Sequence, residues 1–97
     1  MRHTLTQNED EKCFTFTLSE SVNGEEKHSK SKISYDEVKQ MYKYNIPADV
    51  VIVRTCILDL FHLSKDADLS KHINLEQQKE VLNICDDVKE QLKTILE

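Results

Sequence analysis

The chain has 97 residues, of which 38% are apolar and 32% are charged, and its formal net charge is −5. These values predict one globular domain, residues 1–97, with a small core, and they exclude the composition of a disordered chain. The negative charge disfavours a general nucleic-acid binder, because such proteins need lysine and arginine to displace counterions from phosphates. No apolar run long enough for a signal peptide or a membrane span is visible, so we expect a cytoplasmic protein.

The first third of the chain has the pattern of an antiparallel hairpin. Residues 13–19 alternate between apolar and polar side chains, which is typical of a half-buried strand. Asn23-Gly24 follows, and this pair is a strong hairpin signal because both central residues of the turn need a positive φ. We therefore predict two strands joined at this turn.

The turn also fixes the expected register of the hairpin. Folding about it places Phe16 opposite Ser31 and Thr17 opposite Lys30, with apolar or small residues on one face and threonine and lysine on the other. Residues 2–6 can add a third strand. Residues 1–33 are therefore predicted to form a hairpin or a three-strand meander.

A first helix is expected from Tyr35 to about Tyr44. Ser34 and Glu37 have the spacing of a capping box, in which each side chain accepts a hydrogen bond from the other residue's backbone N–H. This signal marks the point where the apolar pattern changes from the period of a strand to that of a helix. Residues 34–97 are therefore predicted to be helical for the most part.

A second helix is expected from Pro47 to about Leu63, since proline is favoured at the first helical position. The run 50–53 (VVIV) is also compatible with a strand, but the length of the segment and its proline start favour a helix. Apolar side chains occur on nearly every side of this helix. We expect it to be the centre of the domain, covered either by its own chain or by another molecule.

A third helix is expected after Asn74, which is a good N-cap and has Gln77 in the capping-box position. Its apolar residues recur at alternating intervals of four and three, as in a heptad repeat. They are Val81, Cys85, Val88, Leu92 and Ile95. The fold class is therefore predicted to be α+β, with an N-terminal antiparallel sheet followed by three helices, the second of them central.

No catalytic or metal-binding motif is apparent. The three cysteines do not form a CxxC pair, and we expect reduced thiols, with Cys56 and Cys85 in the core and Cys13 partly exposed. Cys56 and His62 point to different sides of one helix, so they do not fit one metal ion. A single glycine excludes a glycine-rich phosphate loop. We expect no catalytic residues, no metal and no cofactor.

Residues 27–54 form a modest basic segment, with six basic and three acidic side chains, between two acidic ends. Basic and aromatic side chains on neighbouring elements can contact a partner, and they can also simply be solvated. The candidate partner-binding residues are Lys30, Lys32, Lys39, Tyr42 and Lys43. The candidate self-association residues, on the heptad stripe, are Val81, Val88, Leu92 and Ile95.

By elimination, the sequence favours a non-enzymatic protein–protein interaction domain that acts by stoichiometric binding. The expected role is regulatory or inhibitory, as in small proteins encoded by phages or mobile elements. The expected partner is a protein, with a homodimer through the second and third helices as one form. An acidic surface that mimics nucleic acid is a weaker interpretation. The main alternative is a small nucleic-acid-binding regulator that uses Lys30, Lys32, Lys39 and Lys43.

Overall fold

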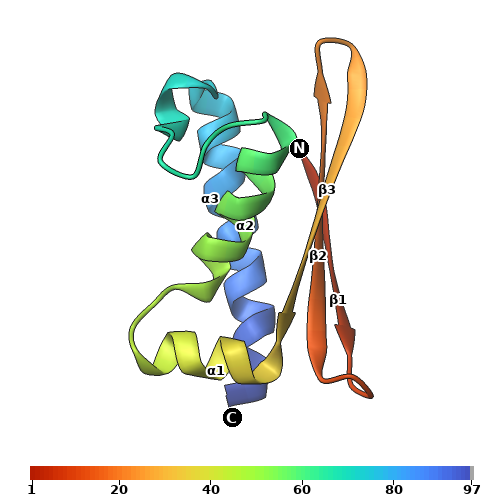
Figure 1. The fold of residues 1–97 in the computed structure, drawn as a ribbon, viewed down its shortest axis with the longest axis vertical. Coiled ribbons are helices and arrows are strands. Elements are labelled where there is room, and N and C mark those ends of the chain that lie inside the picture. The colour runs from red at the N-terminus through yellow and green to blue at the C-terminus, as the bar shows by residue number, and fades with distance from the viewer. Residues whose placement is uncertain (97) are drawn as a thin grey trace.

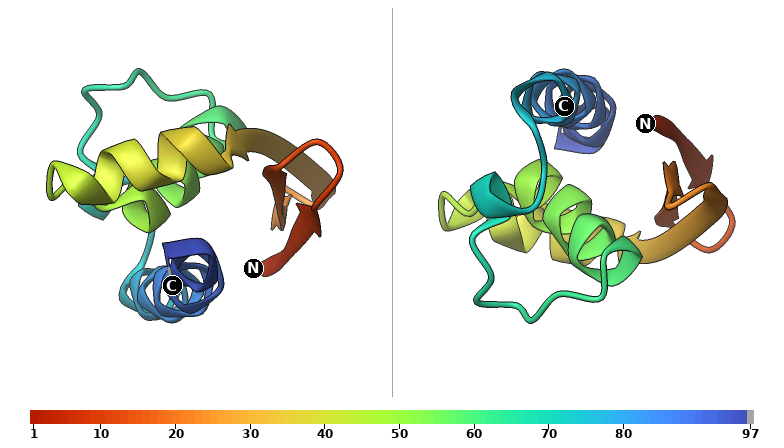
Figure 2. Two further views of the ribbon diagram at one scale, coloured as in Figure 1. Left: turned by 90° about the horizontal axis from the view of Figure 1, so that it is seen from below. Right: turned by 90° about the horizontal axis from the view of Figure 1, so that it is seen from above.

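The computed structural model describes residues 1–96. It has two layers, a three-stranded antiparallel sheet of order β1-β2-β3 and a layer of helices on one face of that sheet (Figures 1 and 2). The elements are β1 (Arg2–Asn8), β2 (Cys13–Val22), β3 (Glu25–Ser34), α1 (Tyr35–Lys43), α2 (Ala48–Leu60) and α3 (Leu75–Leu92), with short 3-10 turns at Leu69–Lys71 and Lys93–Leu96. The predicted α+β class is confirmed, and the sheet is the three-strand meander.

The register of the sheet is the one that the Asn23-Gly24 turn predicts. Phe16 pairs with Ser31 and Thr17 with Lys30 across β2 and β3. The inner face of β2 is formed by side chains that are almost completely buried, namely Phe14, Phe16 and Leu18. The other face carries threonine and lysine and has no helix over it (Figure 2). The alternating pattern therefore determines which face receives the helices.

The predicted capping box at the start of α1 is present. The Ser34 hydroxyl accepts from the Glu37 N–H, and the Glu37 carboxylate accepts from the Ser34 N–H, both at 3.1 Å. At the other end, Asn45 has a φ of 60°, and the Ile46 N–H bonds to the Met41 carbonyl. This is a Schellman ending, which stops the helix and redirects the chain toward α2.

Helix α2 ends earlier than predicted, at Leu60 and not near Leu63. The reason is a second Schellman ending, in which His62 takes a φ of 52° and the Leu63 N–H bonds to the Leu58 carbonyl. At the start, Pro47 is the N-cap residue and not the first helical residue. The predicted helix is otherwise confirmed.

Helix α2 is central, as expected: it packs against β2, β3, α1 and α3. Its C-terminal half is also covered by the following segment of chain, because the Arg54 guanidinium donates to the carbonyl oxygens of Lys65 and Ala67. Its N-terminal half has no such cover, and Val50 and Val51 remain exposed. The chain thus covers one half of its most apolar helix and leaves part of the other half open.

Helix α3 begins with the predicted capping box of Asn74 and Gln77. Of the residues that we assigned to self-association, Val88 and Leu92 are completely buried in the core of the monomer, while Val81 and Ile95 pack against that core and are half-buried. Their side chains face the rest of the chain. Val88 and Leu92 therefore cannot bind a second copy without opening the fold, and they stabilise the monomer instead.

Helix α3 also lies beside the edge strand β1, where Nε2 of the His3 imidazole is hydrogen-bonded to the Asp87 carboxylate at 2.7 Å. This contact joins residues that are far apart in the sequence. Cys13, which we expected to be partly exposed, is buried, as are Cys56 and Cys85, and all three thiols are free. Within residues 1–96, no helix has the length and apolarity that a membrane crossing needs.

Candidate functional site

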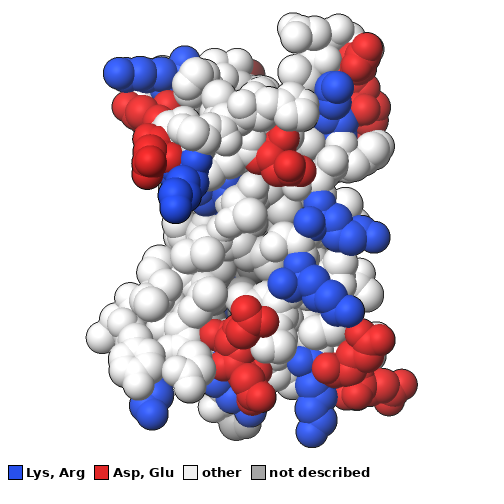
Figure 3. Space-filling model, viewed as in Figure 1, with Lys and Arg blue, Asp and Glu red and all other residues white. Residues whose placement is uncertain are grey.

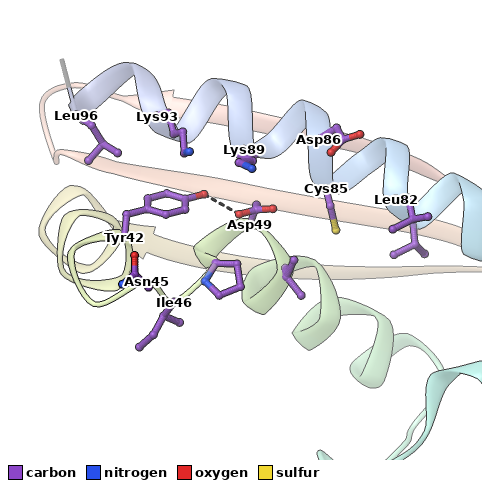
Figure 4. Close-up of a pocket in the computed structure, with 13 residues that line it drawn as sticks. Tyr42, Asn45, Ile46, Asp49, Leu82, Cys85, Asp86, Lys89, Lys93 and Leu96 are labelled. Atoms are coloured by element: carbon purple, nitrogen blue, oxygen red, sulfur yellow. Dashed lines mark hydrogen bonds between the residues drawn. The ribbon is translucent and has the colours of Figure 1, made fainter.

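An open groove runs between α3 and the segment that connects α1 to α2 (Figure 4). Its volume is about 730 Å³. Tyr42 and Leu96 lie at one end of the view, Leu82 lies at the other, and Asp49 lies between them. Most of the lining side chains are apolar, among them Ile46, Pro47, Val50, Val81, Leu82 and Leu96.

A smaller apolar hollow of about 290 Å³ extends this groove along α3. It lies between the 3-10 turn at Leu69–Lys71 and α3, and it shares Val81 and Leu82 with the groove. Ile73 and Gln78 complete its lining. One side of α3 is therefore hollowed along much of its length.

One side of the groove is positioned by the Schellman ending of α1. The left-handed residue Asn45 turns the chain sharply, so that Ile46 and Pro47 lie next to the first turn of α2. Ile46 and Val50 remain exposed in this position, on one side of the groove. Leu82 and Leu96, from α3 and the turn after it, remain exposed on the other side.

A hydrogen bond closes the floor of the groove. The Tyr42 hydroxyl donates to a carboxylate oxygen of Asp49 at 2.7 Å, and Asp49 is only 4% exposed. Asp49 lies in the first turn of α2, where the positive end of the helix dipole favours a negative charge. Burial, followed by the bond to Asp49, raises the pKa of Tyr42 far above its ordinary value. The hydroxyl is therefore neutral and already bonded.

The thiol of Cys85 borders the same groove. Burial, followed by the negative charges of Asp49 and Asp86, raises its pKa to about 11. Because the thiolate is the nucleophilic form, a raised pKa makes the thiol unreactive near neutral pH. Cys85 acts here as a small apolar side chain.

Charged residues of α3 and of the turn after it form the rim of the groove. They are Asp86, Lys89 and Lys93. The Lys93 ammonium lies 5.4 Å from the centre of the Tyr42 ring, a distance suited to a cation–π contact. Among the described residues, Lys89 and Lys93 have no acidic partner in an ion pair. The groove therefore has an apolar interior and an edge that carries both signs of charge.

The predicted basic surface is divided between two elements. Lys30 and Lys32 lie on the open face of the sheet, where the Lys32 ammonium pairs with the Glu11 carboxylate at 2.9 Å. Lys39 and Lys43 are exposed on α1, which leaves the end of β3 and runs away from the sheet (Figure 1). Tyr42 lines the groove. Figure 3 shows basic side chains along the sheet, with acidic side chains close to them at both ends.

Among residues 1–96, no three His, Cys, Asp or Glu side chains gather in a way that could hold a metal ion. Comparisons with protein-family models, with curated proteins and with solved structures give no match for this chain. The groove itself was not predicted from the sequence. Its residues were recognised as apolar, but nothing in the sequence says which of them the other helices leave uncovered.

Proposed function

We propose that the protein is a non-enzymatic protein-binding domain that acts by stoichiometric contact through the groove between α3 and the α1–α2 connection. The observation that carries this proposal is the convergence of four exposed apolar side chains on one hollow. They are Ile46, Val50, Leu82 and Leu96. Contiguous apolar surface on a small domain is costly to leave in water, and it is typical of sites that another macromolecule covers.

The polar groups of the groove support binding over reaction. A general base or nucleophile needs a free proton-accepting atom or an activated thiol. The Tyr42 hydroxyl is engaged with Asp49, and the pKa of Cys85 lies far above neutrality. These groups give the groove a fixed floor, which favours a rigid docking surface.

The alternative, nucleic-acid binding through the lysines, has less support. Lys32 pairs with Glu11, and Arg2 pairs with Glu26, so these cations are already partly neutralised. Contacts to phosphates require cations that are grouped along one surface. The division of the predicted lysines between the sheet and α1 works against such a grouping.

Site-specific photo-crosslinking in native cell lysate tests the proposal. We expect a photoreactive p-benzoylphenylalanine at Leu82, in the groove, to form a protein adduct of one defined mass. The same probe at Thr17, on the open sheet face, is the matched control and should form none. Adducts only from Thr17, adducts that a nuclease removes, or no adduct from either position would overturn the proposal.

A further inference from the structure

We propose that the groove binds a second copy of this chain, with the two α3 helices packed antiparallel about a twofold axis. This inference rests on the proposed function, because it names the partner of the same groove. It concerns an outer stripe, which we define as Leu75, Leu82 and Lys89 of α3 together with Leu96 of the 3-10 turn that follows. This stripe is separate from the buried residues Val88 and Leu92.

The outer stripe has the regularity of a helix–helix seam. Its four members follow one another at intervals of seven residues, so the three that belong to α3 lie on nearly the same side of the helix. Leu96, in the 3-10 turn after α3, lines the same groove as Leu82 and Lys89. Its three leucines are exposed, Leu75 to 75%, Leu82 to 66% and Leu96 to 41%. Leucines with this repeat and this exposure are typical of a helix that packs against another helix.

The order of the stripe makes it complementary to itself when two copies run antiparallel. If the axis passes between Cys85 and Asp86, Leu75 of one copy lies opposite Leu96 of the other. Leu82 then lies opposite Lys89, whose aliphatic stem can cover the leucine while its ammonium reaches water or an acid. A twofold axis repeats each of these contacts, as an isologous interface requires.

The charges on the rim fit the same arrangement. Asp86 is one helical turn from Leu82, so in the second copy it lies within reach of the Lys89 ammonium that covers that leucine. The symmetry produces two such Lys89–Asp86 pairs. A parallel arrangement would instead place Lys89 beside Lys89, which is unfavourable. The mixed rim therefore favours the antiparallel pair.

The groove can accommodate the α3 helix of the second copy. Ile46 and Val50, on the α2 side, can cover the flank of the second α3 helix, so that α2 and α3 of each copy form a four-helix layer. The hollow beside Leu69 and Ile73 continues this apolar surface toward the other end of the stripe. The occupant thus buries the open half of α2 together with the outer stripe.

The first test is the mass in solution. We expect light scattering to give twice the chain mass of 11.3 kDa at high concentration, with dissociation on dilution. Leu82→Asp should give the single-chain mass at every concentration. Asn83→Asp is the matched control, because it adds the same charge at the next exposed position, away from the groove. A wild-type monomer at all concentrations overturns the inference.

A charge exchange tests the pairing itself. Asp86→Lys or Lys89→Asp alone places like charges together twice in the dimer, so we expect each to weaken dimerisation at least tenfold. The double variant restores opposite charges and should restore the mass. A foreign partner has no reason to regain affinity for the double variant. Failure of the double variant to recover, with its helical circular dichroism intact, would contradict the pairing.

Engineered cysteines test the direction of packing. Asp86→Cys lies next to the axis and should form a disulfide-linked dimer under mild oxidation. Leu75→Cys lies about 32 Å from its symmetry mate, from a rise of 1.5 Å for each of the intervening residues, and should not. Equal linkage at both positions would indicate a parallel pair. If the Leu82 photo-crosslink instead captures a different protein, the proposed function stands and the second copy is excluded.

Discussion

Helix α3 carries two apolar stripes with different fates. The inner stripe, with Val88 and Leu92, has intervals of four and three and is buried against α2 and the sheet. The outer stripe (Leu75, Leu82, Lys89 and Leu96) has intervals of seven, and its three leucines are exposed. Both repeats are typical of a helix that packs against another element. Only the inner stripe, which is the broader band of apolar side chains, offers enough apolar surface to organise a core. The outer stripe is narrower and remains available for contact with a second molecule.

The largest expected change in the free energy of unfolding distinguishes the inner stripe from the outer one. Leu92→Asp places a charge in the core and should lower the free energy of unfolding by roughly 4 kcal/mol or more, enough to unfold much of the protein. Leu82→Asp should change that free energy by less than about 0.5 kcal/mol in the monomer. Urea titration followed by circular dichroism measures both. Equal losses would show that the outer stripe also belongs to the core.

The next effect tests the floor of the groove, which lies between the stripes and α1. Tyr42→Phe removes the donor to Asp49 and leaves a buried carboxylate oxygen without its partner. We expect a loss of about 2 kcal/mol in the free energy of unfolding. Tyr44→Phe is the control, because Tyr44 is exposed and should change the stability very little. Similar values for the two variants would mean that the Tyr42–Asp49 bond does not stabilise the fold.

A smaller loss of stability is expected at the N-cap of α3, the helix that carries both stripes. Asn74→Ala removes the side chain that accepts from the Gln77 N–H at 2.8 Å, and it should cost about 1 kcal/mol. Asn74→Asp retains an oxygen acceptor and a favourable charge at the helix start, so it should keep most of the stability. Thermal unfolding of the two variants side by side gives the comparison. If Asn74→Ala unfolds at the same temperature as the wild type, the Asn74 side chain does not stabilise the start of α3.

The last effect is a loss of stability that begins only above about pH 9. Cys85 has a pKa of about 11 in the folded protein against an ordinary value of 9.0, so folding favours the protonated thiol. This contribution is fully present below pH 9 and is lost as the pH rises through 11. Wild-type protein should therefore lose stability in this range, and Cys85→Ala should lose less. Urea titrations at about pH 8, 9 and 10.5 test the slope, and parallel slopes would contradict this cause.

The sequence predicts the features of this fold that depend on neighbouring residues. The hairpin register follows from the Asn23-Gly24 turn and the alternation of Phe16 with Thr17, which leaves one register with a buried face. The capping boxes at Ser34 and Asn74 mark the two helix starts because their hydrogen bonds span only three residues.

The sequence does not predict what the helices leave uncovered. Leu82 and Val88 are both apolar residues of one helix, and only the placement of α2 and the sheet decides that the first is exposed and the second is buried. The assignment of Val88 and Leu92 to self-association was wrong for this reason. The end of α2 was misplaced because His62 gives no compositional signal of a left-handed residue, which glycine would have given.

Within residues 1–96, four residues other than glycine adopt a left-handed backbone: Lys12, Asn23, Asn45 and His62. For lysine and histidine, contact between Cβ and the neighbouring carbonyl oxygen costs roughly 1 kcal/mol at each position. Glycine would remove that strain but would also loosen the unfolded chain. The turns at Lys12 and His62 are therefore strained. They are the first positions to change in the design of a more stable variant of this protein.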